Sequence, residues 1–285
     1  MKKSTFQKII WDYYIRHGRH DLPWRTHITP YRILVSEIML QQTQVDRVIP
    51  FFKKWMRSFP SLKKLSQASQ RDVLAHWKGL GYNSRALRLQ KLAQIIMDAH
   101  GGNIPMSTVA LEALPGIGPY TASAVRIFVR GEPDICIETN IRRIFLHHFF
   151  TDQENVHDRD IYTLIEKTFP VNLPDHPFFA DHTIPHVATH WYWALMDYGS
   201  HLPKRIGKNS NTQSKHYTQQ KKFKGSDREI RGKILALLLE HQTLSRTRLY
   251  TMLGTEKDRY ARILDDMKRE GFITMTGRRV FLVDR

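Results

Sequence analysis

Apolar residues recur at helical spacing through the first two hundred residues of the chain. In the segment 83–102, Ala86, Leu89, Ala93 and Ile96 lie one turn apart, and a pair of glycines ends the pattern. Alternation typical of strands is scarce in this part, so the pattern predicts an all-helical core. Comparable periodicity predicts further helices at 1–14, 30–44, 45–59, 69–81, 119–131, 139–150, 158–169 and 185–200.

The pattern changes near residue 203. Residues 203–225 lack periodicity and are rich in Lys, Asn, Gln and Ser, which is typical of a linker or a surface loop with positive charge. Three more helices and a β-hairpin that turns at Thr276–Gly277 then favour a winged helix, a module that binds DNA in some proteins and other proteins elsewhere. The sequence predicts these helices at 227–241, 244–254 and 256–271, and the hairpin at 272–284.

These elements predict a domain organisation. The expected fold class is all-α, with two helical domains and a C-terminal winged-helix-like domain. The expected boundaries are a discontinuous helical domain of 1–26 plus 134–203, a six-helix bundle of 27–133, a basic linker of 204–225 and a winged-helix-like domain of 226–285.

Composition adds a strong positive charge to this picture. The 285 residues include 44 Lys and Arg against 27 Asp and Glu, a formal net charge of +17. Such an excess favours a polyanionic partner, nucleic acid first, although a basic protein without such a partner is an alternative. The single cysteine, Cys136, cannot form an intrachain disulfide or a Cys-rich metal site and fits a reducing compartment. No apolar run has the length of a membrane span or a signal peptide, so we expect no membrane partner and a cytoplasmic location, at the nucleoid if the source is prokaryotic. We also expect a monomer.

A glycine-rich turn at 114–122 is the first candidate for chemistry. Gly116 and Gly118 flank the apolar Ile117, just before a helix that starts at Pro119. Glycine lets the backbone approach a ligand closely, and the first N–H groups of a helix are free to bind an anion. A phosphate of the DNA backbone suits that geometry. The alternative is a tight corner that binds nothing.

Five segments together resemble a known family. They are LPWR at 22–25, SEIMLQQTQV at 36–45, GLGYNSRA at 79–86, LPGIGPYTA at 114–122 and ETNIRRIF at 138–145. Their order and spacing resemble the helix-hairpin-helix (HhH-GPD) DNA glycosylase superfamily, most of all the A/G-specific adenine DNA glycosylases of the MutY type, over about residues 20–200. The resemblance implies base-excision repair of DNA, with an active site in a cleft between two helical domains.

Glu37 is the first of two candidate catalytic acids. It shares a helical face with Ile33 and Leu40, in line with an apolar stripe. Burial is expected to raise its pKa, so that it holds a proton and donates it to the leaving base. The alternative is a surface glutamate that turns to solvent.

Glu138 has the opposite expected setting. It precedes a helix whose cap we expect at Thr139 or Asn140, and this helix end and nearby Arg142 or Arg143 favour the ionised carboxylate. N-glycosidic cleavage needs such a pair, one acid to protonate the base and one anion to stabilise an oxocarbenium-like sugar. The alternative is a helix cap or an ion pair. The family pattern has Asp at this position, and the extra methylene is expected to move the carboxylate unless the backbone compensates.

The resemblance implies roles for further residues. Bifunctional relatives carry a Lys where this chain has Tyr120, which cannot form an imine, so we expect a monofunctional glycosylase. Gln42 and Tyr82 match residues that wedge into DNA when the target base flips out. For each residue alone, core packing or a surface charge is an equal alternative. The residues that match the base pocket are Trp24, Arg25, Leu40 and Asn140.

Two features of the family are missing from the sequence. Most relatives hold a [4Fe–4S] cluster with four cysteines after a segment like WALMDYG at 193–199, but here Pro203 stands about where the first cysteine would be. We therefore expect no cluster and no other cofactor, with segment 204–224 in place of the cluster. We also expect no lesion-reading domain like that of typical adenine glycosylases, which is similar to a Nudix hydrolase; the winged-helix-like module stands in its place. A zinc site is conceivable but ordinary packed or solvated histidines are favoured, so we expect no metal; the histidines in question are His176, His182, His186 and His190.

These inferences lead to one leading function and two alternatives. The leading function is hydrolysis of the N-glycosidic bond of a flipped, mispaired base in double-stranded DNA, above all adenine opposite guanine or 8-oxoguanine. The alternatives are a uracil or thymine mismatch glycosylase and a non-catalytic DNA-binding protein on the same fold. Both enzymatic functions require Glu37 and Glu138 to converge on one extruded nucleotide.

Overall fold

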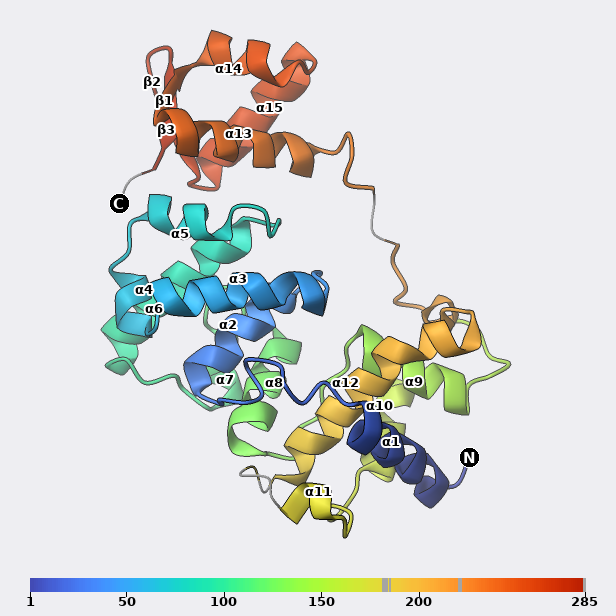
Figure 1. Ribbon diagram of the computed structural model, residues 1–285. Helices are drawn as coiled ribbons and strands as arrows, with labels where there is room; N and C mark the ends of the chain where they lie inside the picture. The colour runs from blue at the N-terminus through green and yellow to red at the C-terminus, as the bar shows by residue number, and fades with distance from the viewer. Residues whose placement is uncertain (181–183, 185, 220–221, 284–285) are drawn as a thin grey trace. The chain divides into compact units, whose positions relative to one another are not determined.

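The chain is mostly helical, as the sequence predicts (Figure 1). A computed structural model describes residues 1–180, 184, 186–219 and 222–283. Among these residues no helix is both long and apolar enough to cross a membrane. The helices are α1 (Lys3–His17), α2 (Pro30–Leu40), α3 (Val45–Ser58), α4 (Leu62–Ser66), α5 (Gln70–Trp77), α6 (Ser84–His100), α7 (Thr108–Glu112), α8 (Pro119–Arg130), α9 (Thr139–Phe149), α10 (Asp158–Thr168), α11 (Pro177–Ala180), α12 (Val187–Ile206), the 3-10 helix η1 (Ser210–Gln213), α13 (Asp227–His241), α14 (Arg246–Leu253) and α15 (Lys257–Arg269).

The chain forms two compact units. The first unit comprises residues 1–34, 106–112 and 117–219, and the second comprises residues 35–105, 113–116 and 220–285. Residues 222–283, the described part of the C-terminal region, belong to the second unit and are called the C-terminal module below.

The core of the first unit forms where α1 and α9 pack on α12. Phe6 of α1 is fully buried, and its ring centroid lies 5.3 Å from that of Phe145 and 6.1 Å from that of Trp191. Such tilted and edge-on aromatic pairs stabilise a core beyond their burial alone. The helix predicted at 1–14 is confirmed, and Phe6, Ile10 and Tyr14 lie on its buried face.

The core of the second unit is built on α6. Leu89, Ala93 and Ile96 are fully buried on one face, which confirms the predicted helical period. On α3 and α5, Trp55 and Trp77 meet edge to face with centroids 5.4 Å apart. This core supports the two turns that follow α2 and precede α6.

The C-terminal module has three helices and a small antiparallel sheet. The predicted hairpin is confirmed as β2 (Ile273–Thr276) and β3 (Arg279–Leu282), and β1 (Thr243–Ser245) pairs with the other edge of β3. The strand order is β1-β3-β2. This arrangement matches the winged-helix-like module expected from the sequence.

Part of the segment expected to be a linker is regular and packed. Residues 203–206 complete α12, and η1 packs on α9 with Ser210 and Asn211 buried. Asn211 Nδ2 donates to the carbonyl oxygen of Thr139 at 3.0 Å, and Gln213 Nε2 donates to that of Phe150 at 2.7 Å. Polar side chains, which show no apolar period in the sequence, therefore hold this segment onto α9.

Candidate active site and nucleic-acid interface

Glu37 lies on the buried face of α2, in the part of that helix that belongs to the second unit. Its exposed fraction is 6%, and Ile33, one turn earlier, is also buried. The predicted alignment with an apolar stripe is confirmed, whereas the alternative of a solvent-exposed surface side chain is wrong. Leu40, at the end of the helix, is only partly buried. A carboxyl held away from bulk water is the environment of known catalytic proton donors.

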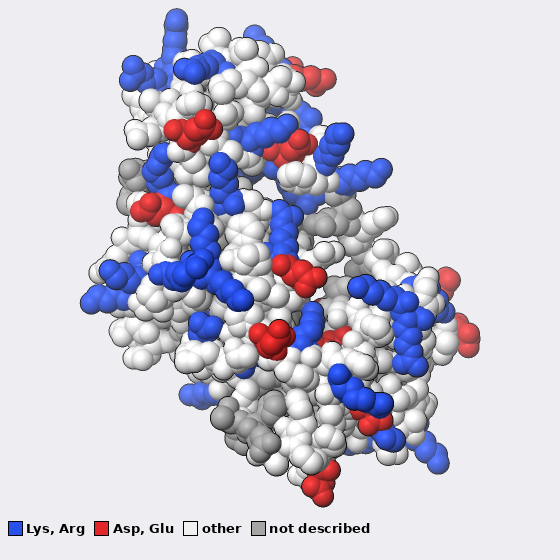
Figure 2. Space-filling model, viewed as in Figure 1, with Lys and Arg blue, Asp and Glu red and all other residues white. Residues whose placement is uncertain are grey.

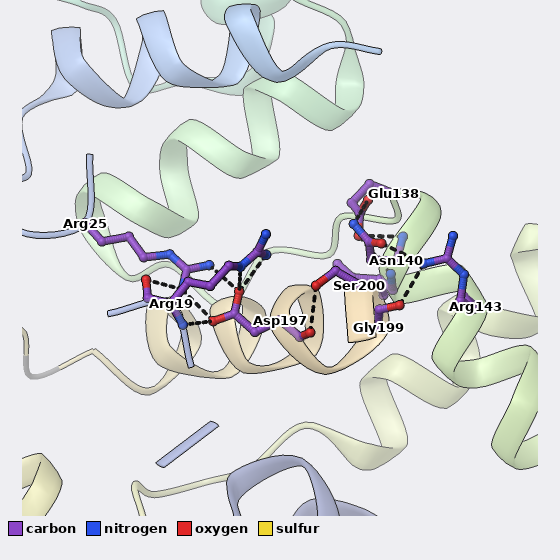
Figure 3. Close-up of polar contacts among 9 residues, drawn as sticks. Arg19, Arg25, Glu138, Asn140, Arg143, Asp197, Gly199 and Ser200 are labelled. Carbon is purple, nitrogen blue, oxygen red and sulfur yellow. Dashed lines mark hydrogen bonds and ion pairs between the residues drawn. The ribbon is translucent and has the colours of Figure 1, made fainter. Parts of the chain in front are cut away.

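Glu138 caps the N terminus of α9 in the first unit. Its Oε1 accepts hydrogen bonds from the backbone N–H groups of Asn140 and Ile141, both at 2.8 Å, and its Oε2 accepts one from Asn140 Nδ2 at 3.0 Å (Figure 3). The expectation of a cap at Thr139 or Asn140 is therefore wrong. Ser, Thr, Asp and Asn are the usual caps; here the longer glutamate folds back over the first turn. This cap fixes the carboxylate beside the helix end despite its extra methylene.

The ionisation of Glu138 depends on opposed effects. Burial raises the pKa of its carboxyl, while the two backbone N–H groups and the charges of Arg143 and Arg142 lower it, and the net pKa lies above its ordinary value. The expected net shift toward the ionised form is therefore wrong in direction. One reason is that the Arg142 guanidinium donates two hydrogen bonds, both of 2.7 Å, to Asp158. Its charge is thus largely balanced by another carboxylate.

Close packing of α9 on α12 positions this cap. A Cβ on Gly199 would lie only 2.3 Å from the carbonyl oxygen of Asn140, so a larger residue would force the helices apart. Arg143 donates to the Gly199 carbonyl oxygen at 2.7 Å and to Asn140 Oδ1 at 2.8 Å (Figure 3). Asn140 therefore connects Glu138 to Arg143 and α12, and its predicted place in the base pocket stays a prediction.

The segment between α8 and α9 is held by a buried tyrosine and an arginine. Tyr192 Oη donates to the carbonyl oxygen of Asp134 at 2.9 Å and accepts from the Cys136 N–H at 3.4 Å. Arg126 of α8 pairs with the Asp134 carboxylate at 2.8 Å. Because these bonds lie shortly before Glu138 along the chain, they restrict where the chain enters α9.

Trp24 and Arg25 are both buried in the first unit. The Arg25 guanidinium donates to the two carboxylate oxygens of Asp197 at 2.7 and 3.0 Å, and Arg19 adds a 2.6 Å bond (Figure 3). Burial raises the pKa of Asp197, but these arginines lower it more, so the carboxyl titrates below its ordinary range. Arg25 also lies over Trp193, 4.9 Å from the ring centroid. The pocket roles of Trp24 and Arg25 stay predictions, and Asp197 is a structural residue that the sequence analysis missed, although an acid in the apolar segment WALMDYG was a usable signal.

The glycine-rich turn combines a buried anchor with an open backbone. Gly116 has φ +88°, a conformation that favours glycine, and the side chain of Ile117 is buried, so only its backbone is available to a ligand. Gly118 caps α8 with an ordinary φ of −105° and is exposed, and a Cβ there would meet no atom within 4 Å. Glycine is therefore not required at 118 by the fold itself. Tyr120, in the first turn of α8, is partly buried.

Two strained residues mark the turns around the end of α2 and the start of α6. Gln42 and Tyr82 have φ of +56° and +48°, which non-glycine residues rarely adopt. Such backbone strain gathers at functional sites. Gln42 is exposed and Tyr82 is half-exposed, so both side chains are accessible in the way that their predicted contacts with DNA require.

A buried arginine, which the sequence analysis missed, joins these two turns. Arg85 is 5% exposed and donates to Thr43 Oγ1 at 3.1 Å and to the Gly81 carbonyl oxygen at 2.8 Å. Burial lowers the pKa of its guanidinium to about 10. The same side chain also donates, at 3.1, 2.7 and 2.6 Å, to the carbonyl oxygens of Ile38, Met39 and Gln41. These carbonyls lie at the end of α2, where intrahelical partners run out.

The histidines show ordinary packing where the structure describes them. His190 is buried, with Nδ1 3.1 Å from Tyr14 Oη and Nε2 3.0 Å from the carbonyl oxygen of Ile184. The ring of His186 packs against Gly131. His182 lies outside the described residues. In the described ranges, no three His, Cys, Asp or Glu side chains gather in a way that could hold a metal ion.

The chain is similar to known proteins both in sequence and in structure. The family model described as HhH-GPD superfamily base excision DNA repair protein matches residues 35–170. The chain is 35% identical over 175 residues to the adenine DNA glycosylase of Buchnera aphidicola subsp. Acyrthosiphon pisum, a match that covers 60% of this chain and 50% of that protein. It therefore spans only about half the length of this relative.

A second relative and a solved structure cover more of the chain. The adenine DNA glycosylase of Mycolicibacterium smegmatis is 30% identical over 282 residues, covering 91% of this chain and 90% of that protein. The structure of a thermostable thymine-DNA glycosylase superposes with a TM-score of 0.57 at 23% identity, covering 70% of this chain and 86% of that one, and shows that the fold is shared. Together with the five sequence segments, these matches show that the chain belongs to the HhH-GPD superfamily of base excision DNA repair proteins.

Proposed function

We propose that the chain is a monofunctional DNA glycosylase that removes a mispaired base from double-stranded DNA, above all adenine opposite guanine or 8-oxoguanine. The observation that carries the proposal is the buried carboxyl of Glu37, on the helix that leads directly into the exposed turn at Gln42. Adenine is the favoured base because relatives at 30–35% identity are adenine DNA glycosylases.

The two glutamates have complementary roles in the proposed reaction. Glu37 donates its proton to a ring nitrogen of the flipped base, which makes the base a better leaving group. As the bond between the base and the sugar C1′ breaks, ionised Glu138 stabilises the positive charge that develops on the sugar. Water then adds to C1′ and gives up a proton, which restores the acid and leaves a free base and an abasic site. Convergence of both carboxyls on one nucleotide is part of this proposal.

Tyr120 makes the proposed enzyme monofunctional. A phenol cannot form the imine through which a lysine at this position links to the sugar. We therefore expect base release without strand cleavage, and no covalent capture of the enzyme on a substrate duplex by borohydride.

Several surfaces are suited to hold the DNA. The open backbone at Gly118 and the first N–H groups of α8 suit a phosphate, and the turns at Gln42 and Tyr82 suit the gap left by the flipped base. Basic side chains are spread over the face of the molecule seen in Figure 2, in keeping with the net charge of +17. We propose double-stranded DNA as the partner, a monomeric enzyme, and a cytoplasmic location, at the nucleoid if the source is prokaryotic.

The proposed enzyme uses no iron–sulfur cluster. The chain has one cysteine, Cys136, which is buried next to Tyr192 and cannot supply four thiolates. The residues present therefore do not fit the cluster. We propose that the segment through η1 does its structural work, because its hydrogen bonds to α9 tie the chain after α12 to the helix that Glu138 caps.

The substitution Glu37→Gln tests the proposal. It keeps the size of the side chain and removes the proton that is donated, so base release is expected to fall by at least about a hundredfold while duplex binding is retained. The assay uses duplexes that differ only in the candidate base, with alkali treatment to cut abasic sites. Release of uracil or thymine rather than adenine would favour a mismatch glycosylase of that type, and no release by the wild-type chain would favour a non-catalytic DNA-binding protein.

A further inference from the structure

The C-terminal module is attached to the rest of the second unit through both ends of α13. At its start, Arg228 donates a hydrogen bond to Tyr82 Oη, and its guanidinium carbon lies 5.1 Å from the centroid of the Tyr82 ring. At its end, Arg71 of α5 donates to the carbonyl oxygens of Leu238, at 3.3 Å, and Leu239. Those carbonyls belong to the last turn of α13, which has no intrahelical donors for them. The attachment therefore satisfies groups that would otherwise need water.

A second pair of contacts holds the module next to the sheet. Gln70, at the start of α5, donates to the carbonyl oxygen of Gly271 at 2.7 Å. The preceding residue, Glu270, accepts from Arg231 of α13 at 2.8 Å. The chain just before β2 is thus connected both to α5 and to α13, which restrains the module a second time.

Three arginines of the helix that would enter a DNA groove in a winged helix are paired with carboxylates of the same module. This helix is α15, by its place after α14 and before the hairpin. Arg259 and Arg262 each donate to Asp227 at 2.8 Å, and Arg269 pairs with Asp266. These arginines are directed to carboxylates of their own module, so the geometry favours a docked module over an independent DNA reader.

We propose that the C-terminal module contributes Arg228 as a DNA-contacting residue beside Tyr82. The inference rests on the proposed function, in which the Tyr82 ring enters the gap left by the flipped base. A guanidinium that lies over this ring and donates to its hydroxyl is carried to the same gap, where phosphate oxygens and base edges are the available acceptors. Arginine is well suited to both, because its planar group donates several hydrogen bonds and stacks on rings.

The test measures the affinity of the full chain for a duplex with an uncleavable abasic-site analogue at the target position. Arg228→Ala is expected to weaken binding about tenfold, the effect of losing one such contact. If the contact is to a phosphate, the slope of log affinity against log salt concentration falls by about one, whichever base stands opposite the target. If the contact is to a base edge, the loss of affinity changes with the opposite base. Either pattern supports the proposal.

Three further variants keep the test sharp. Arg228→Lys keeps the charge but not the planar group and is expected to recover only part of the affinity. Arg71→Ala removes the contact at the far end of α13 and is expected to weaken binding less than Arg228→Ala. Arg278→Ala, a matched control, removes an exposed arginine at the tip of the wing and is expected to leave binding unchanged.

Distinct outcomes would overturn the inference. Equal or tighter binding by Arg228→Ala, with an unchanged melting temperature, would overturn this inference and leave the proposed function standing. Tighter binding would also identify the contact with Tyr82 as inhibitory. A loss with Arg278→Ala as large as that with Arg228→Ala would show that the wing itself reads DNA. A wild-type chain that does not bind the duplex would overturn the proposed function as well.

Discussion

The charged caps at the N terminus of α9 and at the C terminus of α2 differ in origin. At the N terminus of α9, the carboxylate of Glu138 accepts from the free N–H groups of the first turn. At the C terminus of α2, the guanidinium of Arg85 donates to the free carbonyl oxygens of the last turn. Each sign matches the partial charge of its helix end. Each cap also orders a segment that the proposed reaction uses.

The difference is the distance along the chain between cap and helix. Glu138 bonds to groups two and three residues away, so its local sequence already offered a cap as an alternative. Arg85 reaches carbonyls 44–47 residues earlier, and it bonds to Thr43 and Gly81 in two different turns at once. A local cap stabilises one helix end, whereas the distant one makes two turns depend on each other.

The largest expected effect is on the distant cap. Arg85→Met keeps an unbranched, largely apolar stem but removes the guanidinium, which leaves several buried carbonyl oxygens without this donor. Each such group costs about 1–3 kcal/mol, so the free energy of unfolding is expected to fall by about 3 kcal/mol or more. The measurement is urea unfolding followed by tryptophan fluorescence. Arg88→Met, an exposed arginine on the same helix, is the control and is expected to change stability by under about 0.5 kcal/mol; equal losses in both variants would contradict the role of Arg85.

The local cap is expected to separate activity from stability. Glu138→Gln keeps an oxygen that accepts from the helix end but removes the charge, so base release is expected to fall by about a hundredfold or more. Stability at neutral pH is expected to be unchanged or higher. Burial raises the pKa of Glu138 in the folded chain, so the unfolded chain loses this proton first as pH rises, and stability declines over that range. A marked loss of stability in Glu138→Gln at pH 7 would contradict this account.

The pH dependence of Glu138 has a matched opposite in Asp158. Hydrogen bonds from Arg142 lower the pKa of Asp158, so its stabilising effect is present at neutral pH and is lost as pH falls through that lowered pKa. Asp158→Asn is therefore expected to lose stability at pH 7. For the enzyme, a raised pKa of Glu138 places the acid limb of the base-release profile above the range of an ordinary glutamate. If the acid limb of the base-release profile lies at the same pH in Glu138→Gln as in the wild-type chain, the limb does not belong to Glu138.

The sequence predicted what depends on short-range pattern. Helical periodicity located α6 and the buried face of Glu37, and a Thr–Gly turn located the C-terminal hairpin, because these features follow from neighbouring residues. Arg85 and Asp197 were missed because partners such as Thr43 and Arg25 lie 42 and 172 residues away in sequence and are brought near only by folding. The net pKa of Glu138 was misjudged for the same reason: burial is a property of the packed unit, not of the segment.

The smallest expected effect on stability is at Gly118, the exposed glycine that caps α8. The same position is expected to show a clear effect on DNA binding. A side chain at Gly118 would be neither strained nor crowded, since φ is −105° and no atom lies within 4 Å of a Cβ there. Gly118→Ala is therefore expected to change the free energy of unfolding by less than about 1 kcal/mol. A bound phosphate, however, must approach this backbone closely, and the added methyl group is expected to weaken duplex binding about tenfold at low salt. The measurement pairs a thermal melt with a binding titration. Val129→Ala, near the far end of the same helix, is the control; if Gly118→Ala binds DNA as tightly as this control, the open backbone of the turn does not hold a phosphate, and its glycine has another cause.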